Sequence, residues 1–199
     1  QARSVSSFAL GAVRERATHG AVEVAVGEVV VSTHVVSFLR RLPTGEVIGE
    51  HPLESPVRTL RTVGVWWTVT PEALLAAGID PPLQPGALHA AEHAAIGMLP
   101  LVATADRWDV GGVSTVLHPD TGLPTVLVYD GYPGGAGFAE RGYAALATWL
   151  AATRDAVAGC GCAHGCPSCV QSPKCGNGNE PLAKNAAVAL LDLVLAQLP

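Results

Sequence analysis

The chain has 199 residues, enough for one domain or two small ones, and its hydrophobic content of 49% can supply a buried core. Its net charge of −5 and pI of about 5.8 argue against a domain that coats nucleic acid through an overall basic surface, so any DNA contact must be local. No apolar run reaches the length of a membrane span and no signal peptide follows Gln1, a start without Met that suggests excision from a longer chain.

The N-terminal part of the chain is expected to be rich in β-strands. Residues 1–20 show no periodicity and are interpreted as a lead-in segment that could pair with a preceding part of a longer chain. Residues 21–85 are predicted to form a β-rich subdomain, in which valines alternate over 22–26 and a second β-rich run covers 28–42. A turn at 43–45 then leads into a short strand, so antiparallel strands and a hairpin are expected.

Helices are expected to begin after a strand over residues 63–69. Thr70 can cap a helix that starts at Pro71 and stops at Gly78. After a proline-rich connector, an alanine-rich helix is predicted over residues 87–98.

Residues 86–199 are predicted to form a mixed α/β subdomain. A hairpin is expected from residues 114–117 and 125–129, followed by helices over 137–157 and 182–198. A cysteine-rich loop joins these two helices and would hold them together. The predicted fold class is therefore α+β, with an antiparallel β-rich N-terminal part followed by a mixed α/β part with a zinc-stapled helical C-terminus.

All five cysteines lie in one short window, at Cys160, Cys162, Cys166, Cys169 and Cys175. The turn between Cys166 and Cys169 brings two thiolates within reach of one tetrahedral ion, and Zn²⁺ is the expected cofactor. Four of the five thiols are expected to be ligands. Cys162, Cys166 and Cys169 are the central three, and the spacing does not choose between Cys160 and Cys175 as the fourth.

A structural zinc site fits this pattern better than disulfides do. An odd number of thiols leaves one unpaired in an all-disulfide scheme, and buried free thiols would scatter along the chain. His164 could replace one thiolate, but four thiolates already fill the shell of a structural zinc, which has no open position for catalysis. The clustered cysteines and the lack of a signal peptide together indicate the reducing cytoplasm.

Several motifs in order carry a resemblance to a known family. Residues 129–137 read Tyr-Asp-Gly-Tyr-Pro-Gly-Gly-Ala-Gly, and residues 165–184 begin Gly-Cys-Pro-Ser-Cys-Val-Gln-Ser-Pro-Lys-Cys-Gly-Asn. Upstream of them stand His89-Ala-Ala-Glu92-His93, Leu99-Pro100, Asp106-Arg107-Trp108-Asp109 and Gly111-Gly112. Over residues 20–199 the chain resembles the C-terminal zinc-binding domain of MrfA-type superfamily-two DNA repair helicases, which are related to the RecQ-like helicases.

The resemblance implies the C-terminal structural zinc-binding domain of an ATP-dependent DNA helicase that acts in DNA repair, with a contribution to DNA strand guidance. The partners it implies are single-stranded or forked DNA and the upstream motor domains of the same parent chain, with no membrane. The chain itself lacks an ATPase motor, because a Walker loop needs a G-x₄-GK run and the only lysines are Lys174 and Lys184. The alternative from another class is a zinc-stabilised protein-interaction module.

The motif His89-x-x-Glu92-His93 supports a third hypothesis, a metal-dependent hydrolase. Two histidines four residues apart share a helix face and can bind zinc, and the order matches an inverted metalloprotease motif with Glu92 as general base. A five-residue pattern also arises by chance, and the three side chains could simply hydrogen-bond an alanine-rich helix to its neighbours. No convincing third ligand accompanies the motif, so the helicase interpretation is favoured.

Two further patterns have both a structural and a functional interpretation. The glycine-rich run of residues 131–137 lies between a strand and a helix, where backbone N–H groups could bind a DNA phosphate, although a tight turn is the more common role of such glycines. Asp106, Asp109 and Asp130 could hold Mg²⁺ as in a nuclease, but the first two are more typical of a charged turn around Arg107.

The candidate DNA contacts are basic residues beside β-strands. Arg58 and Arg61 precede one strand and are the main candidates, and Arg40 and Arg41 end another. Trp66 and Trp67 are near enough in sequence for one ring to stack on a base. Packing of one ring in the core and of the other at an interface is the favoured interpretation.

Overall fold

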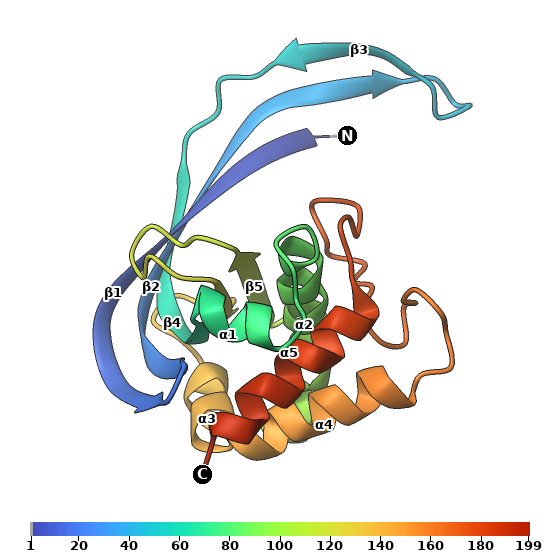
Figure 1. Ribbon diagram of the computed structural model, residues 1–199. Coiled ribbons are helices and arrows are strands. Elements are labelled where there is room, and N and C mark those ends of the chain that lie inside the picture. The colour runs from blue at the N-terminus through green and yellow to red at the C-terminus, as the bar shows by residue number, and fades with distance from the viewer. Residues whose placement is uncertain (1) are drawn as a thin grey trace.

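The computed structural model describes residues 2–199 and consists of one antiparallel sheet with helices on one side (Figure 1). The sheet has six strands in the order β1-β2-β4-β6-β5, and β3 pairs with β2 outside this path. The strands are β1 (Ala2–His19), β2 (Val22–Arg41), β3 (Val47–Pro52), β4 (Arg58–Val69), β5 (Val110–Thr115) and β6 (Thr125–Asp130). The α+β fold class predicted from the sequence is confirmed.

The helices pack against one face of the sheet, the face that carries the main core. They are α1 (Pro71–Ala76), α2 (Gln84–Met98), the 3₁₀ turn η1 (Leu99–Leu101), α3 (Phe138–Ala144), α4 (Leu146–Gly159) and α5 (Lys184–Gln197). Thr70 caps α1 as expected, because its side chain accepts a hydrogen bond from the N–H of Ala73 at 3.3 Å. None of the helices in residues 2–199 combines the length and apolar character needed to cross a membrane.

α2 occupies the centre of the helical layer. Its small residues Ala87, Ala90, Ala91, Ala94 and Ala95 are almost fully buried, and they let the helix approach α4, α5 and β5 closely. All of α2 from Gln84 to Ile96 except Pro85 is buried. The two histidines of this helix are therefore held on a rigid, enclosed element.

Side chains alternate between two cores along the strands. The main core lies under the helices and contains Val22, Val24 and Val26 of β2 with Val63, Val65, Trp67 and Val69 of β4. The smaller core lies on the opposite face and contains Ala25, Val29, Val31, Trp66 and Leu127. Phe8 and Leu10 of β1 pack against this second core.

β1 is a strand that the sequence pattern does not predict. It pairs antiparallel with β2 from Ala2 to His19, whereas regular structure is expected to begin near residue 21. Most of its side chains are exposed, so apolar and polar residues do not alternate. The sheet takes strands from residues 1–20, 21–85 and 86–199 alike, and the division into subdomains stays a prediction.

Two expected boundaries also shift. β2 is one strand rather than two, because Gly27 does not break the chain but faces an irregularity in β1, where an added Cβ would lie 2.5 Å from the carbonyl oxygen of Ala12. The helix expected over 137–157 is divided at Ala145 (φ −110°, ψ 25°). The division lets α3 follow the strands while α4 packs on α2 and α5.

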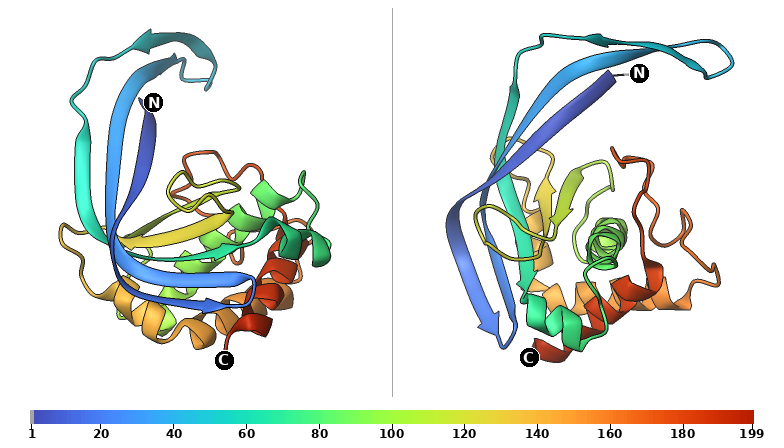
Figure 2. Two further views of the ribbon diagram at one scale, coloured as in Figure 1. Left: turned by 60° about the vertical axis from the view of Figure 1, so that its left-hand side comes forward. Right: turned by 45° about the horizontal axis from the view of Figure 1, so that its top comes forward.

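A curved β arm extends beyond the helices (Figures 1 and 2). We define it as residues 2–7 together with residues 32–57, which include β3 and the distal half of β2. The arm exposes several large apolar side chains, namely Val5, Phe38, Leu42, Val47, Ile48, Leu53 and Val57. A ribbon of this kind has little core of its own and is suited to packing on another surface.

Candidate metal centre

Four cysteine side chains converge in the loop that joins α4 to α5. The Sγ atoms of Cys160, Cys162, Cys166 and Cys169 lie within 4.8 Å of one another. Cys160 is 3.6 Å from both Cys162 and Cys166, and Cys169 is 3.5 Å from Cys162 and 3.8 Å from Cys166. Tetrahedral Zn–S bonds of about 2.3 Å place sulfur atoms about 3.8 Å apart. The cluster therefore has the size and the donor set of a four-thiolate zinc site.

The backbone explains how the turn at Cys166 presents its thiols. The carbonyl oxygen of Cys166 accepts hydrogen bonds from the N–H groups of Cys169, Val170 and Gln171, and the N–H of Cys166 donates to Sγ of Cys169 at 3.3 Å. Val170 is fully buried in the main core. The turn is thus anchored to the helices by an apolar side chain while its thiols face the cluster.

The thiols differ in how readily they ionise. Burial raises the pKa of Cys169 to about 12. Burial also opposes ionisation of Cys162, but hydrogen bonds with the thiols of Cys169, Cys160 and Cys166 outweigh it and lower its pKa to about 7. A divalent cation would supply the positive charge needed to ionise the remaining thiols.

Lys184 connects the cysteine cluster to α5. It is the buried first residue of that helix, and its Nζ donates hydrogen bonds to the carbonyl oxygens of Cys160 and Cys162, the latter at 2.7 Å. The helix dipole disfavours a cation at this end of a helix. The two carbonyl contacts explain why a lysine is nevertheless placed there.

Cys175 lies apart from the other four thiols. Its Sγ is 3.4 Å from Nε2 of His89, and it forms a second group with His89 and His93, whose ligand atoms also lie within 4.8 Å of one another. Of the two candidates for the fourth position, the structure brings only Cys160 together with the central three. His164 is exposed and belongs to neither group among residues 2–199.

Glu92 is directed to the sheet, away from this second group. Its Oε2 accepts a hydrogen bond from Oγ of Ser114 at 2.7 Å, and a Cβ added at Gly112 would lie 2.8 Å from its Oε1. Burial raises the pKa of Glu92 to about 7, although the hydrogen bond from Ser114 acts in the opposite direction. Burial also lowers the pKa of His93 to about 4. The side chains of the His89-x-x-Glu92-His93 motif therefore point in two directions. The carboxyl group packs on β5, and the two histidines face the loop that joins α4 to α5, which we call the C-terminal loop.

The glycine-rich run after β6 wraps around the carboxylate of Asp130. Asp130 is fully buried and accepts hydrogen bonds from the N–H groups of Ala136 at 2.5 Å, Phe138 at 3.2 Å and Ala139 at 2.8 Å. Gly135 has a φ of 86°, which suits glycine in this tight turn. The donors at the start of α3 are therefore taken by an internal carboxylate rather than offered to a phosphate.

The turn between β5 and η1 is closed by its own carboxylates. Asp106 accepts from the N–H of Trp108 at 2.9 Å, and Asp109 accepts from the N–H of Asp106 at 2.8 Å and from the hydroxyl of Tyr132 at 2.6 Å. With Asp130 occupied at α3, the three aspartates do not gather as a magnesium site anywhere in the described chain.

Trp108 is the most exposed of the large aromatic residues that the structure describes, and the sequence pattern does not single it out. Its side chain is 63% exposed, and Nζ of Lys174 lies 5.4 Å from the ring centroid. Trp66 and Trp67 are only 1% and 0% exposed, so neither ring is free to stack on a base. The sequence does contain a signal for this exposure. Trp108 lies in a turn between two aspartates, and a large ring in such a polar turn is expected to remain at the surface.

Arg58 and Arg61 lie at the start of β4, next to the β arm. Both are exposed, and neither forms an ion pair with any residue that the structure describes. They lie three positions apart in a regular strand, so their side chains point to opposite faces of the sheet. The structure therefore does not bring them together into one basic site.

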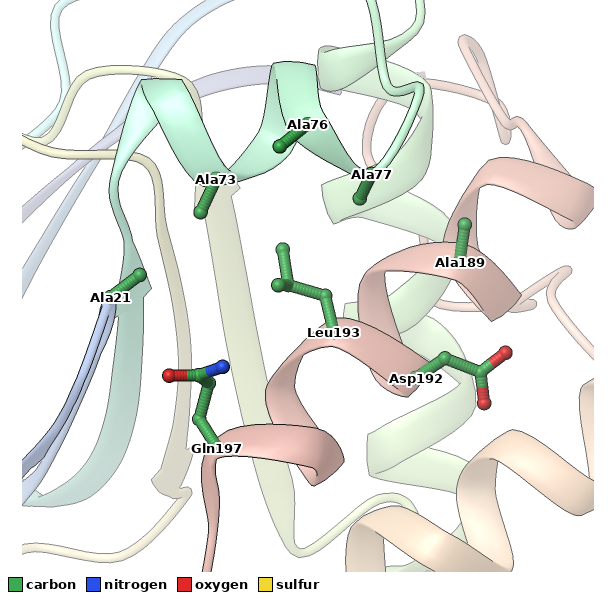
Figure 3. A pocket seen from close by; sticks show the side chains of 8 residues that line it. All are labelled: Ala21, Ala73, Ala76, Ala77, Ala189, Asp192, Leu193 and Gln197. Atoms are coloured by element: carbon green, nitrogen blue, oxygen red, sulfur yellow. The ribbon is translucent and has the colours of Figure 1, made fainter.

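A groove of about 540 Å³ lies between α1 and α5, and none of the five cysteines lines it (Figure 3). Its lining is mostly small and apolar, with Leu193, Asp192 and Gln197 contributed by α5. Asp192 already accepts a hydrogen bond from Arg154 at 2.8 Å. The groove presents no set of catalytic or metal-binding side chains.

The fold and the cysteine cluster together define an α+β domain with a metal-binding loop between its last two helices. A family model described as the MrfA Zn-binding domain matches residues 91–170, which include all four cysteines of the cluster and end before Cys175. Residues 91–170 belong to this family, which confirms the resemblance found in the sequence.

Two relatives show different chain lengths. The chain is 32% identical over 146 residues to the "Uncharacterized ATP-dependent helicase YprA" of Bacillus subtilis, covering 72% of this chain and 19% of that protein. It is 35% identical over 114 residues to the "Uncharacterized protein MJ1572.1" of Methanocaldococcus jannaschii, covering 55% of this chain and 100% of that protein. The chain thus spans about a fifth of the helicase relative but the whole of the archaeal one.

Solved structures share the fold. The crystal structure of DUF1998 helicase MrfA bound to DNA matches with a TM-score of 0.72 at 24% identity, over 97% of this chain and 25% of that chain. The same helicase bound to DNA and AMPPNP matches with a TM-score of 0.56 at 24% identity, over 96% of this chain and 22% of that chain.

Proposed function

We propose that this chain is the C-terminal structural zinc-binding domain of an ATP-dependent DNA helicase that acts in DNA repair in the cytoplasm, and that it helps to guide a DNA strand. The observation that carries the proposal is the four-thiolate cluster, which lies within the region matched by the zinc-binding family model. Cys160, Cys162, Cys166 and Cys169 would hold the zinc. Cys175 is left out of this shell because its thiol faces His89.

The bound zinc would have a structural role. Four thiolates close its coordination shell, so no position remains for a substrate. This chain's own contribution is to hold the loop in shape through the turn at Cys166 and the carbonyl contacts of Lys184. The loop in turn fixes the start of α5 against α2 and α4.

The contribution to DNA binding would be local. The acidic net charge of −5 does not support a domain that binds DNA by its whole surface. Arg58, Arg61 and Trp108 are exposed and offer two cations and one ring. The two arginines face opposite sides of β4. One of them would therefore contact the DNA strand, while the other would lie on the far side of the sheet from the DNA. Two of the MrfA structures contain DNA, which supports DNA as the partner proposed for this chain.

The β arm is the surface proposed for the motor domains. The helicase relative extends well beyond the part covered by this chain, which is 19% of its length. The arm exposes apolar residues from all three of its strands, including Val5 of β1, Phe38 of β2 and Ile48 of β3. Packing of the motor domains on these residues would bury them and would fix the position of the arm relative to the bound DNA strand.

The proposal is tested in a full-length helicase that contains this chain. Substitution of Cys166 by Ser should reduce DNA unwinding more than DNA-stimulated ATP hydrolysis. The motor domains would stay intact, but the zinc-binding domain would no longer guide the DNA strand. Exposed Ser168, in the same turn but outside the cluster, provides the matched control as Ser168→Ala. Normal unwinding by the zinc-free variant would refute strand guidance and favour a protein-interaction module instead.

The hydrolase hypothesis has little geometric support. A general base must lie next to the metal-bound water that it activates. Glu92 is instead hydrogen-bonded to Ser114 on the sheet, and it is not part of the group formed by His89, His93 and Cys175.

A further inference from the structure

A second group of metal-binding side chains joins α2 to the loop beyond the cysteine cluster. His89 and His93 lie one helical turn apart with ring centroids separated by 4.2 Å, and Cys175 approaches from the loop with its Sγ 3.4 Å from Nε2 of His89. One ligand atom from each residue lies within 4.8 Å of the others. No residue is shared with the four-cysteine cluster.

Backbone contacts orient both imidazole rings for binding through Nε2. Nδ1 of His89 lies 2.9 Å from the carbonyl oxygen of Pro181, and Nδ1 of His93 lies 2.8 Å from that of Val170. A carbonyl oxygen can only accept, so Nδ1 carries the proton in each ring and Nε2 is left with its lone pair. This is the arrangement found around metal-binding histidines, where a second partner fixes the tautomer.

The sulfur atom of Cys175 is held by its own loop. The backbone N–H of Asn179 donates to Sγ of Cys175 at 3.2 Å. Asn179 is fixed in turn, because its side chain accepts from the N–H of Ser172 at 2.7 Å and donates to the carbonyl oxygen of Ser172 at 3.1 Å. A backbone donor aimed at the sulfur stabilises the thiolate form that binds metal.

We propose that Nε2 of His89, Nε2 of His93 and Sγ of Cys175 bind a second divalent cation, with Zn²⁺ as the preferred ion. Two imidazoles and one thiolate are a borderline-soft donor set that suits zinc. Three protein ligands leave the fourth position to water or an external ligand, unlike the closed four-thiolate cluster. Binding would displace the thiol proton of Cys175 to the solvent and would tie the C-terminal loop to α2.

The second metal site does not require a helicase function. The family match covers residues 91–170, so His89 and Cys175 both lie outside it. A helicase domain that does not bind the second ion would still contain the four-thiolate cluster. Conversely, the second ion would bind even if the chain does not bind DNA.

The test is the zinc content of the untagged 199-residue chain after dialysis against a weak chelator. About two equivalents are expected, and Cys175→Ser or His89→Gln should each remove one while keeping the other. Cys162→Ser should lower the metal content yet leave a site that Co²⁺ fills with a charge-transfer band from a single thiolate. His164→Ala is the matched control, because His164 is exposed in the same region and outside both groups.

The wild-type stoichiometry decides the matter even if a variant fails to fold. One equivalent that is unchanged in Cys175→Ser would overturn the second site and leave the thiol as a hydrogen-bond partner of His89. If Cys162→Ser then loses its metal while Cys175→Ser keeps it, the four-thiolate site is supported and the second site is not. Each of the two proposals can therefore be refuted without the other.

Discussion

The ammonium group of Lys184 donates a hydrogen bond to the carbonyl oxygen of Cys162 at 2.7 Å, and also reaches that of Cys160. A buried lysine at the first position of α5 thus holds the backbone of two proposed zinc ligands. Lys174, the other lysine, does the same for a different segment, because its Nζ donates to the carbonyl oxygens of Arg107, at 2.8 Å, and of Val110. Both lysines therefore act as internal clamps on the C-terminal loop.

Replacement of Lys184 by Met should weaken zinc binding about tenfold or more, as loss of a partner that orients metal ligands commonly does. The two carbonyl groups lose their buried donor, so the backbone that presents the first two thiols is free to shift. The affinity can be measured by competition with a chromophoric chelator. Lys174→Met is the control, since it removes a comparable clamp from a segment outside the cluster. Equal affinities in wild type and Lys184→Met would show that the clamp does not position the thiols.

The carboxylate of Asp130 should be a major source of stability for the start of α3. Asp130→Asn keeps the size of the side chain but places an amide N–H₂ group among backbone N–H donors, and it should cost about 1–3 kcal/mol of the free energy of unfolding. Urea titration followed by tryptophan fluorescence measures this change. Asp155→Asn is the control, because the Asp155 side chain is 72% exposed. A cost below that of the control would mean that the three N–H groups find other acceptors.

Local signals in the sequence predict much of this fold. Alternating valines identify β4 and the first part of β2, Thr70 marks the start of α1, and the window of cysteines marks the metal-binding loop. These features depend on neighbours within a few residues. Side-chain period and cap chemistry are therefore enough to find them.

The remaining features depend on contacts between distant segments. β1 is stabilised by backbone pairing with β2, and its exposed side chains leave no pattern to detect. Cys175 meets His89 across 86 positions of the chain, which spacing within the cysteine window cannot reveal. Trp66 and Trp67 are adjacent in sequence but enter different cores, so burial of both could be predicted only with the sheet and its two covered faces in hand.

Acid should loosen the tip of the β5–β6 hairpin through His118. Burial lowers the pKa of His118 below its usual 6.5, although Asp120 acts in the opposite direction. The unfolded chain then binds more protons than the folded one near and below pH 6.5, so the stability contributed by neutral His118 is present above that pH and is lost as the pH falls. Nδ1 of His118 accepts from the N–H of Asp120 at 3.2 Å, and protonation removes this acceptor.

The expected slope from this one group is at most about 1.4 kcal/mol per pH unit. Urea unfolding of wild type and His118→Gln at several pH values between about 5 and 8 gives the difference in slope. The variant should be less sensitive to acid over this range, while the exposed His164→Gln control should match wild type. Parallel stability curves for wild type and His118→Gln would show that another group causes any acid sensitivity.

Trp108 should provide the aromatic contact of this domain with single-stranded DNA. Trp108 is 63% exposed, so its ring can stack on a base, whereas the nearby ammonium group of Lys174 is held by two backbone carbonyl oxygens. Trp108→Ala should weaken binding of a short oligonucleotide about tenfold, because one base stack contributes roughly 1–3 kcal/mol. Leu117→Ala is the matched control, since Leu117 is a large apolar residue with a similar exposure of 65%.

Fluorescence anisotropy with a labelled oligonucleotide at low and moderate salt measures both effects. Loss of the ring should lower the affinity at every salt concentration while leaving the salt slope nearly unchanged, because stacking releases no counterions. Arg61→Ala should instead reduce the slope. Identical anisotropy curves for wild type and Trp108→Ala would remove Trp108 from the DNA path and leave the exposed arginines of β4 as the contact to test.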